Sequence, residues 1–78
     1  MKIIVKTVSG SIYQFTQKEN RFFFIRGTLS GEVVKMNNRL KVGQKLDFSF
    51  YKEGLYCTPQ SIPMFLKSSP IQEIVVSF

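Results

Sequence analysis

The segment 45–51, KLDFSFY, alternates apolar and polar side chains along its length. A helix, which repeats every 3.6 residues or so, would spread the apolar side chains around its circumference, whereas a strand gathers them on one face. The segment therefore predicts a strand with one buried face and one solvent-exposed face. The buried set is Leu46, Phe48 and Phe50, and the exposed set is Asp47, Ser49 and Tyr51.

The remaining composition favours the same secondary structure. Alanine, the best helix former, is absent, and β-branched and aromatic residues dominate the apolar positions. Glycines and polar turn residues divide the chain into short segments, which we interpret as strands. The predicted strands are 2–7, 11–16, 21–27, 32–36, 45–51, 55–58 and 71–78, with turns at Gly10, Gly43 and Gly54.

A segment with three prolines, 59–70, interrupts this pattern. Pro63 breaks any long helix, yet proline suits the first position of a helix. We therefore expect Ser61 to cap a single helical turn that reaches Phe65 or Leu66, and the rest of the segment to form a loop.

Short strands separated by frequent turn signals are typical of a small barrel or sandwich. With 78 residues, the chain is long enough for one domain, 1–78. The sequence therefore predicts an all-β fold, a single small β-barrel of five to seven short antiparallel strands with one short helical turn before the last strand. An SH3-like barrel is the first expectation, and an OB-like barrel is the alternative.

A pattern of glycines and apolar residues runs through 27–48, GTLSGEVVKMNNRLKVGQKLDF, at Gly31, Val33, Leu40, Val42, Gly43 and Leu46. In this pattern the segment resembles the β-barrel second domain of translation GTPases, although Gln44 replaces the acidic residue usual after the glycine. The resemblance covers less than a third of the chain and implies a barrel. It implies nothing about GTP, because the sequence has no G-x-x-x-x-G-K-[ST] loop.

The sequence favours a cytoplasmic protein. Cys57 is the only cysteine, so no internal disulfide forms, and we expect its thiol to be buried in a strand. The apolar run at the N-terminus is too short for a signal peptide, and no run is long enough for a membrane span. Abundant Lys, Ile and Phe without Ala or Trp are typical of an AT-rich bacterial or phage genome.

Several function classes are disfavoured. Histidine is absent, so the chain has no Ser-His or Cys-His pair and no histidine metal ligand. The five acidic residues are scattered along the chain. We therefore expect a protein that is not an enzyme, with no cofactor, no metal and no small-molecule substrate, and with no membrane partner.

The segment 21–26, RFFFIR, places large apolar side chains on both faces of a strand, whichever face is buried. Three explanations stay open. Both faces are covered, one of them by Met64, Phe65 and Leu66; or the outer face binds a protein or a second copy of the chain; or its aromatic rings stack on bases while nearby cations hold phosphates.

The net charge of +6 and a run of cations without acids, Lys35, Arg39, Lys41 and Lys45, favour the third explanation. Asn37, Asn38 and Gln44 are expected to add hydrogen-bond donors. The leading hypothesis is a non-catalytic module that binds nucleic acid. Its predicted contacts are Arg21, Phe22, Phe24, Arg26, Lys35, Arg39, Lys41, Lys45 and Tyr51. The alternative is a protein-interaction or self-assembling module, such as a homodimer, that uses strand 21–26 and loop 59–70.

Overall fold

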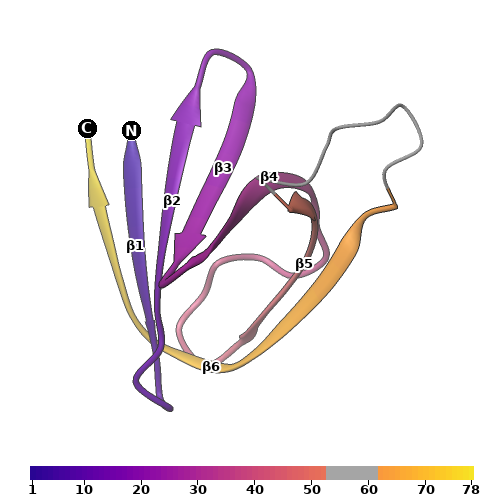
Figure 1. Cartoon of the computed structure of the whole chain (residues 1–78). Coiled ribbons are helices and arrows are strands. Elements are labelled where there is room, and N and C mark those ends of the chain that lie inside the picture. Colours follow the sequence, from indigo (N-terminus) through magenta and orange to yellow (C-terminus); the bar gives the residue numbers. More distant parts are fainter. Residues whose placement is uncertain (53–61) are drawn as a thin grey trace.

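Six antiparallel strands close into a barrel in the computed structural model, which describes residues 1–52 and 62–78 (Figure 1). The strands are β1 (Lys2–Thr7), β2 (Ile12–Lys18), β3 (Arg21–Arg26), β4 (Leu29–Met36), β5 (Lys45–Lys52) and β6 (Met64–Ser77). The prediction of a small all-β barrel with five to seven strands is confirmed. No helix in the described part of the chain is long and apolar enough to cross a membrane.

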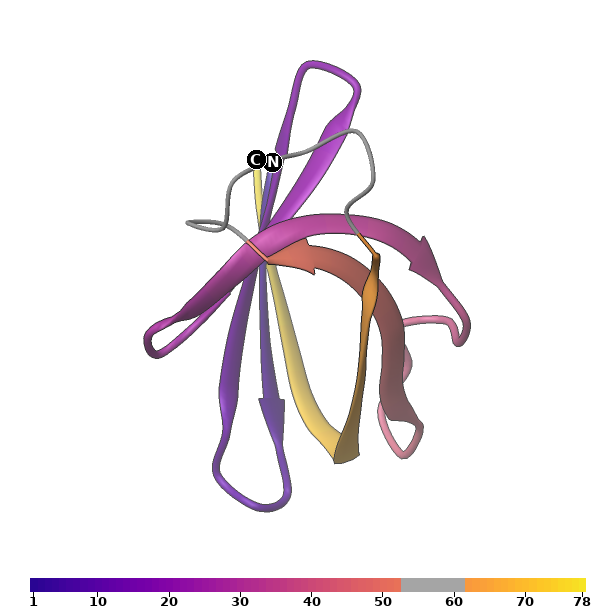
Figure 2. The same ribbon diagram turned by 45° about the vertical axis from the view of Figure 1, so that its right-hand side comes forward.

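Each strand pairs with the next one along the chain, and β6 closes the barrel by pairing with β1. This up-and-down order differs from the Greek-key order of an OB barrel. The pairing of Lys2 with Ser77 brings the two termini side by side, at the end of the barrel that also carries the β2–β3 turn (Figure 2).

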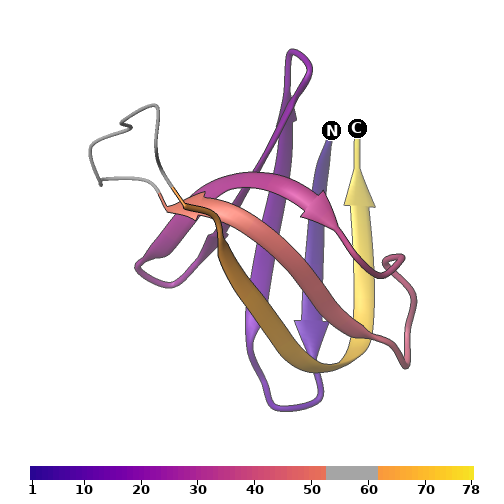
Figure 3. The same ribbon diagram turned by 90° about the vertical axis from the view of Figure 1, so that its right-hand side faces the viewer.

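β6 is long because it belongs to two parts of the barrel wall (Figure 3). Its first half pairs with β5, and its second half, from Ile71 onward, pairs with β1. Pro70 lies where the strand changes partner, and its carbonyl accepts the N–H of Val8 at 2.9 Å. A proline is tolerated there because strand pairing is irregular on both sides of it. At the β5 bulge, the N–H of Leu46 donates to the Ser68 hydroxyl instead, at 2.9 Å.

The predicted helical turn is wrong in the part that the structure describes. Met64, Phe65 and Leu66 are extended and pair with Phe50, Ser49 and Phe48 of β5. Pairing with a neighbouring strand thus outweighs the local signal of Pro63, and residues 64–70 are strand rather than loop. The expected cap at Ser61, the strand 55–58, the turn at Gly54 and Cys57 lie outside the described residues.

Aromatic rings fill the centre of the barrel. Phe24 is 1% exposed, and its ring meets those of Phe48 and Phe50 edge-on, with centroids 4.9 and 4.7 Å apart. Such edge-to-face pairs are favoured beyond the area that they bury. The buried core is Val5, Tyr13, Phe15, Phe24, Leu46, Phe48, Phe50 and Ile71. The alternation predicted for β5 is therefore confirmed on its inner face.

Gly31 of β4 allows the wall of the barrel to bend tightly. A Cβ atom at this position would collide with the backbone carbonyl oxygen of Tyr51 and would lie 3.1 Å from the ring of Phe50. Only a residue without a side chain lets β4 approach β5 so closely. Gly31 pairs with Lys52 at this point, beside Tyr51.

Candidate functional site

The structure decides which face of β3 is buried. Phe24 pairs with Phe15 and points into the core, and Phe22 stacks on Phe15 with centroids 5.3 Å apart and an interplanar angle of 11°. Phe24 is 1% exposed and has no surface on which a base could stack, so its predicted stacking role is wrong. Phe22 is half-buried against the core. The outer face of the strand carries Phe23 and Ile25 instead.

The two arginines of β3 do not meet. Arg21 lies on the outer face, with its Nε 4.0 Å from a carboxylate oxygen of Glu32. Arg26 lies at the other end of the strand, on the face of Phe24, and its guanidinium carbon is 5.5 Å from the centroid of the Tyr13 ring. Burial raises the pKa of Tyr13, and the positive charge of Arg26 opposes this rise. Arg26 therefore packs on an aromatic ring of the barrel itself.

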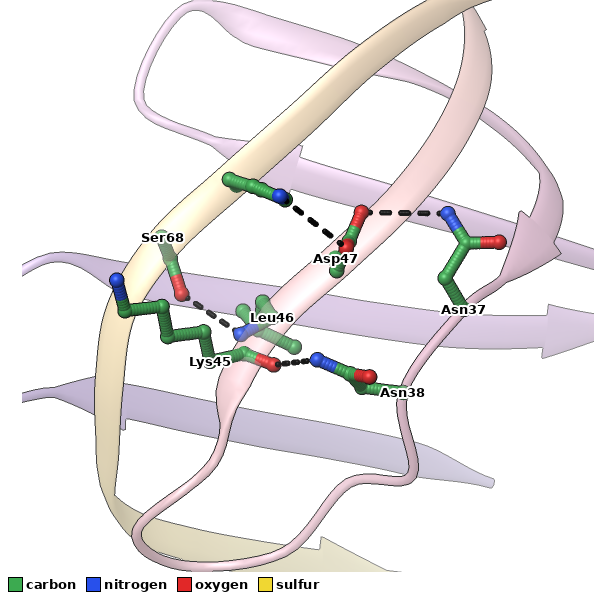
Figure 4. Close-up of polar contacts among 7 residues, drawn as sticks. Asn37, Asn38, Lys45, Leu46, Asp47 and Ser68 are labelled. Carbon is green, nitrogen blue, oxygen red and sulfur yellow. Dashed lines mark hydrogen bonds and ion pairs between the residues drawn. The ribbon is translucent and has the colours of Figure 1, made fainter.

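The basic loop, residues 37–44, joins β4 to β5 and is held at both ends (Figure 4). The backbone N–H of Asn37 donates to the carbonyl of Asp47 at 2.8 Å, and the Asn38 side chain donates to the carbonyl of Lys45 at 3.2 Å. Gly43 and Gln44 exchange backbone hydrogen bonds with Ile71 of β6, both at 2.8 Å. The loop therefore presents its exposed cations, Arg39 and Lys41, from an ordered backbone.

The end of the basic loop that leads into β5 is a tight turn. The N–H of Gln44 donates to the carbonyl of Lys41 at 3.0 Å, and Gly43 has a φ of 93°. A glycine in the third position with positive φ is typical of a type II turn. The expected turn at Gly43 is confirmed. The side-chain amides of Asn37 and Asn38, predicted as donors to phosphate, bond to β5 and stabilise the loop.

Three neighbouring strands carry outward-pointing residues that extend from the basic loop to the far end of β5. We call this surface the β4–β6 face: Lys35 of β4, Asp47, Ser49 and Tyr51 of β5, and Phe65 and Lys67 of β6. Strand register places Lys35, Ser49 and Phe65 in one row across the three strands. Asp47 pairs with Lys67 in the next row. Outward orientation follows from the core, because the alternate residues of β5 point inward.

Phe65 stands out on this face because it is 77% exposed. Its neighbour Ser49 is buried, at 6% exposed, and contributes a small side chain between Lys35 and Phe65. Tyr51, two residues beyond Ser49 on the same side of β5, is 37% exposed. The face thus combines two accessible aromatic rings with the ammonium groups of Lys35 and Lys67.

The acidic Asp47 is engaged by its neighbours. One carboxylate oxygen accepts the side-chain amide of Asn37 at 3.2 Å, and the other lies 4.0 Å from the ammonium group of Lys67 (Figure 4). The cations of the face and its border are Lys35, Arg39, Lys41, Lys45 and Lys67. Two carboxylates offset part of this charge: Asp47, and Glu32 of β4, which lies opposite Tyr51 and 4.0 Å from Arg21. The five cations outnumber them, so the surface stays positive and is suited to an anionic partner.

The structure therefore brings together part of the predicted site. Lys35 and Lys45 lie near the basic loop with Arg39 and Lys41, and Tyr51 lies on the same side of β5 at its other end. Phe22, Phe24 and Arg26 lie on the core side of β3 instead. Sequence reasoning missed Phe65 and Lys67, which it placed in a helical turn and a loop. The alternation of Met64, Leu66 and Ser68 with these two residues was the available signal, and the flanking prolines outweighed it.

Other groups of residues on the described surface are weaker candidates for a binding site. Lys18, Glu19, Arg21 and Phe23 line a shallow depression beside the β2–β3 turn. In residues 1–52 and 62–78, no three acidic, histidine or cysteine side chains come together to hold a metal ion. The β4–β6 face is therefore the surface on which charge and exposed aromatic rings coincide.

Comparisons with protein-family models, with curated proteins and with solved structures found no match for this chain. Its function is consequently inferred from its own surface.

Proposed function

We propose that the protein is a non-catalytic module that binds nucleic acid through the β4–β6 face and the basic loop. The observation that carries this proposal is the set of exposed cations on the neighbouring strands β4, β5 and β6 and on the loop that joins β4 to β5. Lysine and arginine are the usual contacts to phosphate oxygens, and neutralising phosphates releases counterions from the nucleic acid. A cytoplasmic location, expected from the sequence, accords with such a partner.

Each element contributes cations at a different point. Lys35 and Lys67 flank the aromatic residues, Lys45 lies where β5 begins, and Arg39 and Lys41 extend the surface over the loop. The hydrogen bond from the Asn38 side chain to the carbonyl of Lys45 ties the loop to β5, and the one from the N–H of Gln44 to the carbonyl of Lys41 closes the turn within the loop. The phosphates of a bound nucleic acid would then meet cations whose backbone positions are fixed.

The experiment is a fluorescence anisotropy titration with labelled single-stranded DNA, single-stranded RNA and duplex DNA, at low salt and at about 150 mM salt. Lys35→Ala with Lys67→Ala is compared with a control of equal charge, Lys2→Ala with Lys6→Ala on β1. We expect the first pair to weaken binding and to lower the slope of log affinity against log salt by about 1 per lost contact. Equal effects of the two pairs, or no binding at all, would overturn the proposal.

A second candidate function, self-association, is favoured by a different surface. On the outer side of the barrel, Ile25, Gln14, Ile4 and Val75 form a row across β3, β2, β1 and β6. Ile25 is 51% and Val75 is 44% exposed. Two copies of a chain with net charge +6 repel one another, so they would associate best through this uncharged row. A second copy of the chain is therefore the partner that we propose for it.

Sedimentation velocity over a range of concentrations tests this candidate. We expect a dimer that persists at high salt, because apolar contacts are not screened, and that dissociates when Ile25 becomes Lys. A monomer at all concentrations would contradict it. The result is independent of nucleic-acid binding, since the row shares no residue with the β4–β6 face. Its residue on β6, Val75, lies in the half of that strand that pairs with β1.

A further inference from the structure

We infer that the β4–β6 face takes single-stranded nucleic acid and stacks its bases on Phe65 and Tyr51. This inference rests on the proposed function and names its substrate class. It replaces the stacking residues expected on β3, where Phe24 is buried and Phe22 packs on Phe15.

The first argument is the position of Phe65. Its ring is 77% exposed at the second residue of β6, where Phe65 pairs with Ser49, although both strand neighbours, Met64 and Leu66, are less exposed. A single exposed apolar residue is common on protein surfaces. Here, however, the ring stands beside the cation Lys67 and in the same row as Lys35. An accessible ring between ammonium groups is the combination that base stacking with phosphate contact requires.

The second argument is the spacing of the two rings. Phe65 pairs with Ser49, and Tyr51 follows Ser49 by two residues on the same face, so Phe65 and Tyr51 are diagonal neighbours across β5 and β6. Diagonal neighbours in an antiparallel pair lie about 7–8 Å apart, within reach of aromatic side chains. Two successive unpaired bases could therefore occupy the two rings at the same time.

The third argument is the distance from the rings to the cations. Lys67 is two residues from Phe65 along β6, which corresponds to about 7 Å, and Lys35 is two strands away, at about 10 Å. These positions place an ammonium group along β6 and another across the strands from Phe65, whereas Glu32, which is 4.0 Å from Arg21, lies opposite Tyr51. A strand whose bases lie on Phe65 and Tyr51 would keep its phosphates near one or the other ammonium group.

A duplex does not fit this face. Base pairs in a duplex are stacked on one another, and a protein reads them by inserting a helix or a β-ribbon into a groove. Phe65 and Tyr51 lie on the outer side of the barrel wall, near the start of β6 and the end of β5. Rings placed in this way reach bases only when the bases are unpaired.

The test compares three labelled ligands of equal length at about 150 mM salt: a thymidine single strand, a strand of abasic sites with the same phosphates, and a duplex. We expect the thymidine strand to bind at least tenfold more tightly than the other two. Phe65→Ala should weaken binding of the thymidine strand roughly 5- to 150-fold, the range for the loss of one stacked base, and should leave the abasic strand unaffected. Phe78→Ala, which removes another fully exposed phenylalanine, is the matched control and should change neither.

The outcomes separate the inference from the proposed function. If all three ligands bind equally and Phe65→Ala has no effect, the face binds phosphates alone, and the inference is overturned while the proposed function stands. If none of the ligands binds, both fail. Circular dichroism of Phe65→Ala and Phe78→Ala, which alter only exposed side chains, verifies that both variants fold.

Discussion

Phe65 lies directly opposite Ser49 in the β5–β6 pairing, with its ring in solvent, whereas Phe48, the residue before Ser49, is completely buried. One step along the same strand therefore separates the core of the barrel from its candidate binding face. The inward rings hold the wall in place, and the outward side chains are positioned by the same register. The predictions below test first this framework and then the face that it supports.

Gly31→Ala should destabilise the protein by about 3 kcal/mol or prevent folding, because the added methyl group meets the backbone of Tyr51 and cannot be accommodated by a side-chain movement. Gly10→Ala is the comparison. That glycine has a φ of 90° and open space around it, so its substitution should cost only about 1–2 kcal/mol from backbone strain. Urea denaturation measures both, and equal losses would contradict the close approach of β4 and β5.

Phe24→Ala should cost about 3–5 kcal/mol, the usual loss for a fully buried phenylalanine. Phe23→Ala, on the outer side of the same strand, should cost less than half as much because its ring is only partly buried. Chemical denaturation of the two variants therefore assigns the faces of β3 independently. A larger loss for Phe23→Ala would show that the strand is turned the other way.

Folding stability should fall as the pH rises above 10. Burial raises the pKa of Tyr13 above its ordinary value of 10.0, so the folded state holds the phenol proton more tightly than the unfolded state does. The contribution of Tyr13 to the free energy of unfolding has its full value below pH 10. This contribution is lost as the pH rises through the higher pKa of the folded state. Thermal melts of wild type and Tyr13→Phe between pH 8 and 12 measure this loss, which the variant should lack in part.

Arg26→Ala should raise the pKa of Tyr13 further, because the charge of the guanidinium group opposes the effect of burial. Ultraviolet absorbance of the phenolate, recorded as a difference against the same variant with Tyr13→Phe, follows this group alone. An unchanged or lower pKa would mean that Arg26 does not lie over the ring.

Asp47→Asn should tighten nucleic-acid binding by about two- to five-fold at physiological salt, because it removes a negative charge from the face. A gain of this size is what one surface charge contributes when salt screens it. Asparagine retains an oxygen that can accept the amide of Asn37, so the loop should keep its position. Glu73→Gln on the part of β6 that pairs with β1 makes the same charge change elsewhere. Anisotropy titrations with equal gains for the two variants would show that only the total charge matters.

The fold was predictable where a segment carries an unambiguous period. The strand at 45–51 shows a period of two, and its buried and exposed sets were read from the sequence with one exception, since Ser49 is buried between its neighbours on the outer face. The segment 21–26 has large apolar residues on both faces, so its pattern does not indicate which face is buried. Its orientation depends on the pairing of Phe24 with Phe15 and on contacts with β5, which join parts of the chain that are distant in sequence.

The sequence predicted the basic residues of the candidate site but not the exposed aromatic residue Phe65. Lys35, Arg39, Lys41 and Lys45 are close in sequence, so their grouping follows from one loop. Phe65 reaches the same surface only through the pairing of β5 with β6, and the prolines around it predicted a loop instead. Pro63 and Pro70 have no backbone N–H to donate to a neighbouring strand, which is why they predicted a loop. The strand nevertheless continues past Pro70, because its pairing is irregular there.

The most direct test of nucleic-acid binding at the β4–β6 face uses a tryptophan as a local reporter, because the chain contains no tryptophan of its own. Phe65→Trp and, as a control, Phe78→Trp are titrated with a single-stranded oligonucleotide at about 150 mM salt. We predict that the emission of the tryptophan at position 65 is quenched in a saturable manner, whereas the emission of the tryptophan at position 78 hardly changes. Equal responses at the two positions, or no response at position 65 while anisotropy reports binding, would place the nucleic acid elsewhere on the barrel and contradict this account.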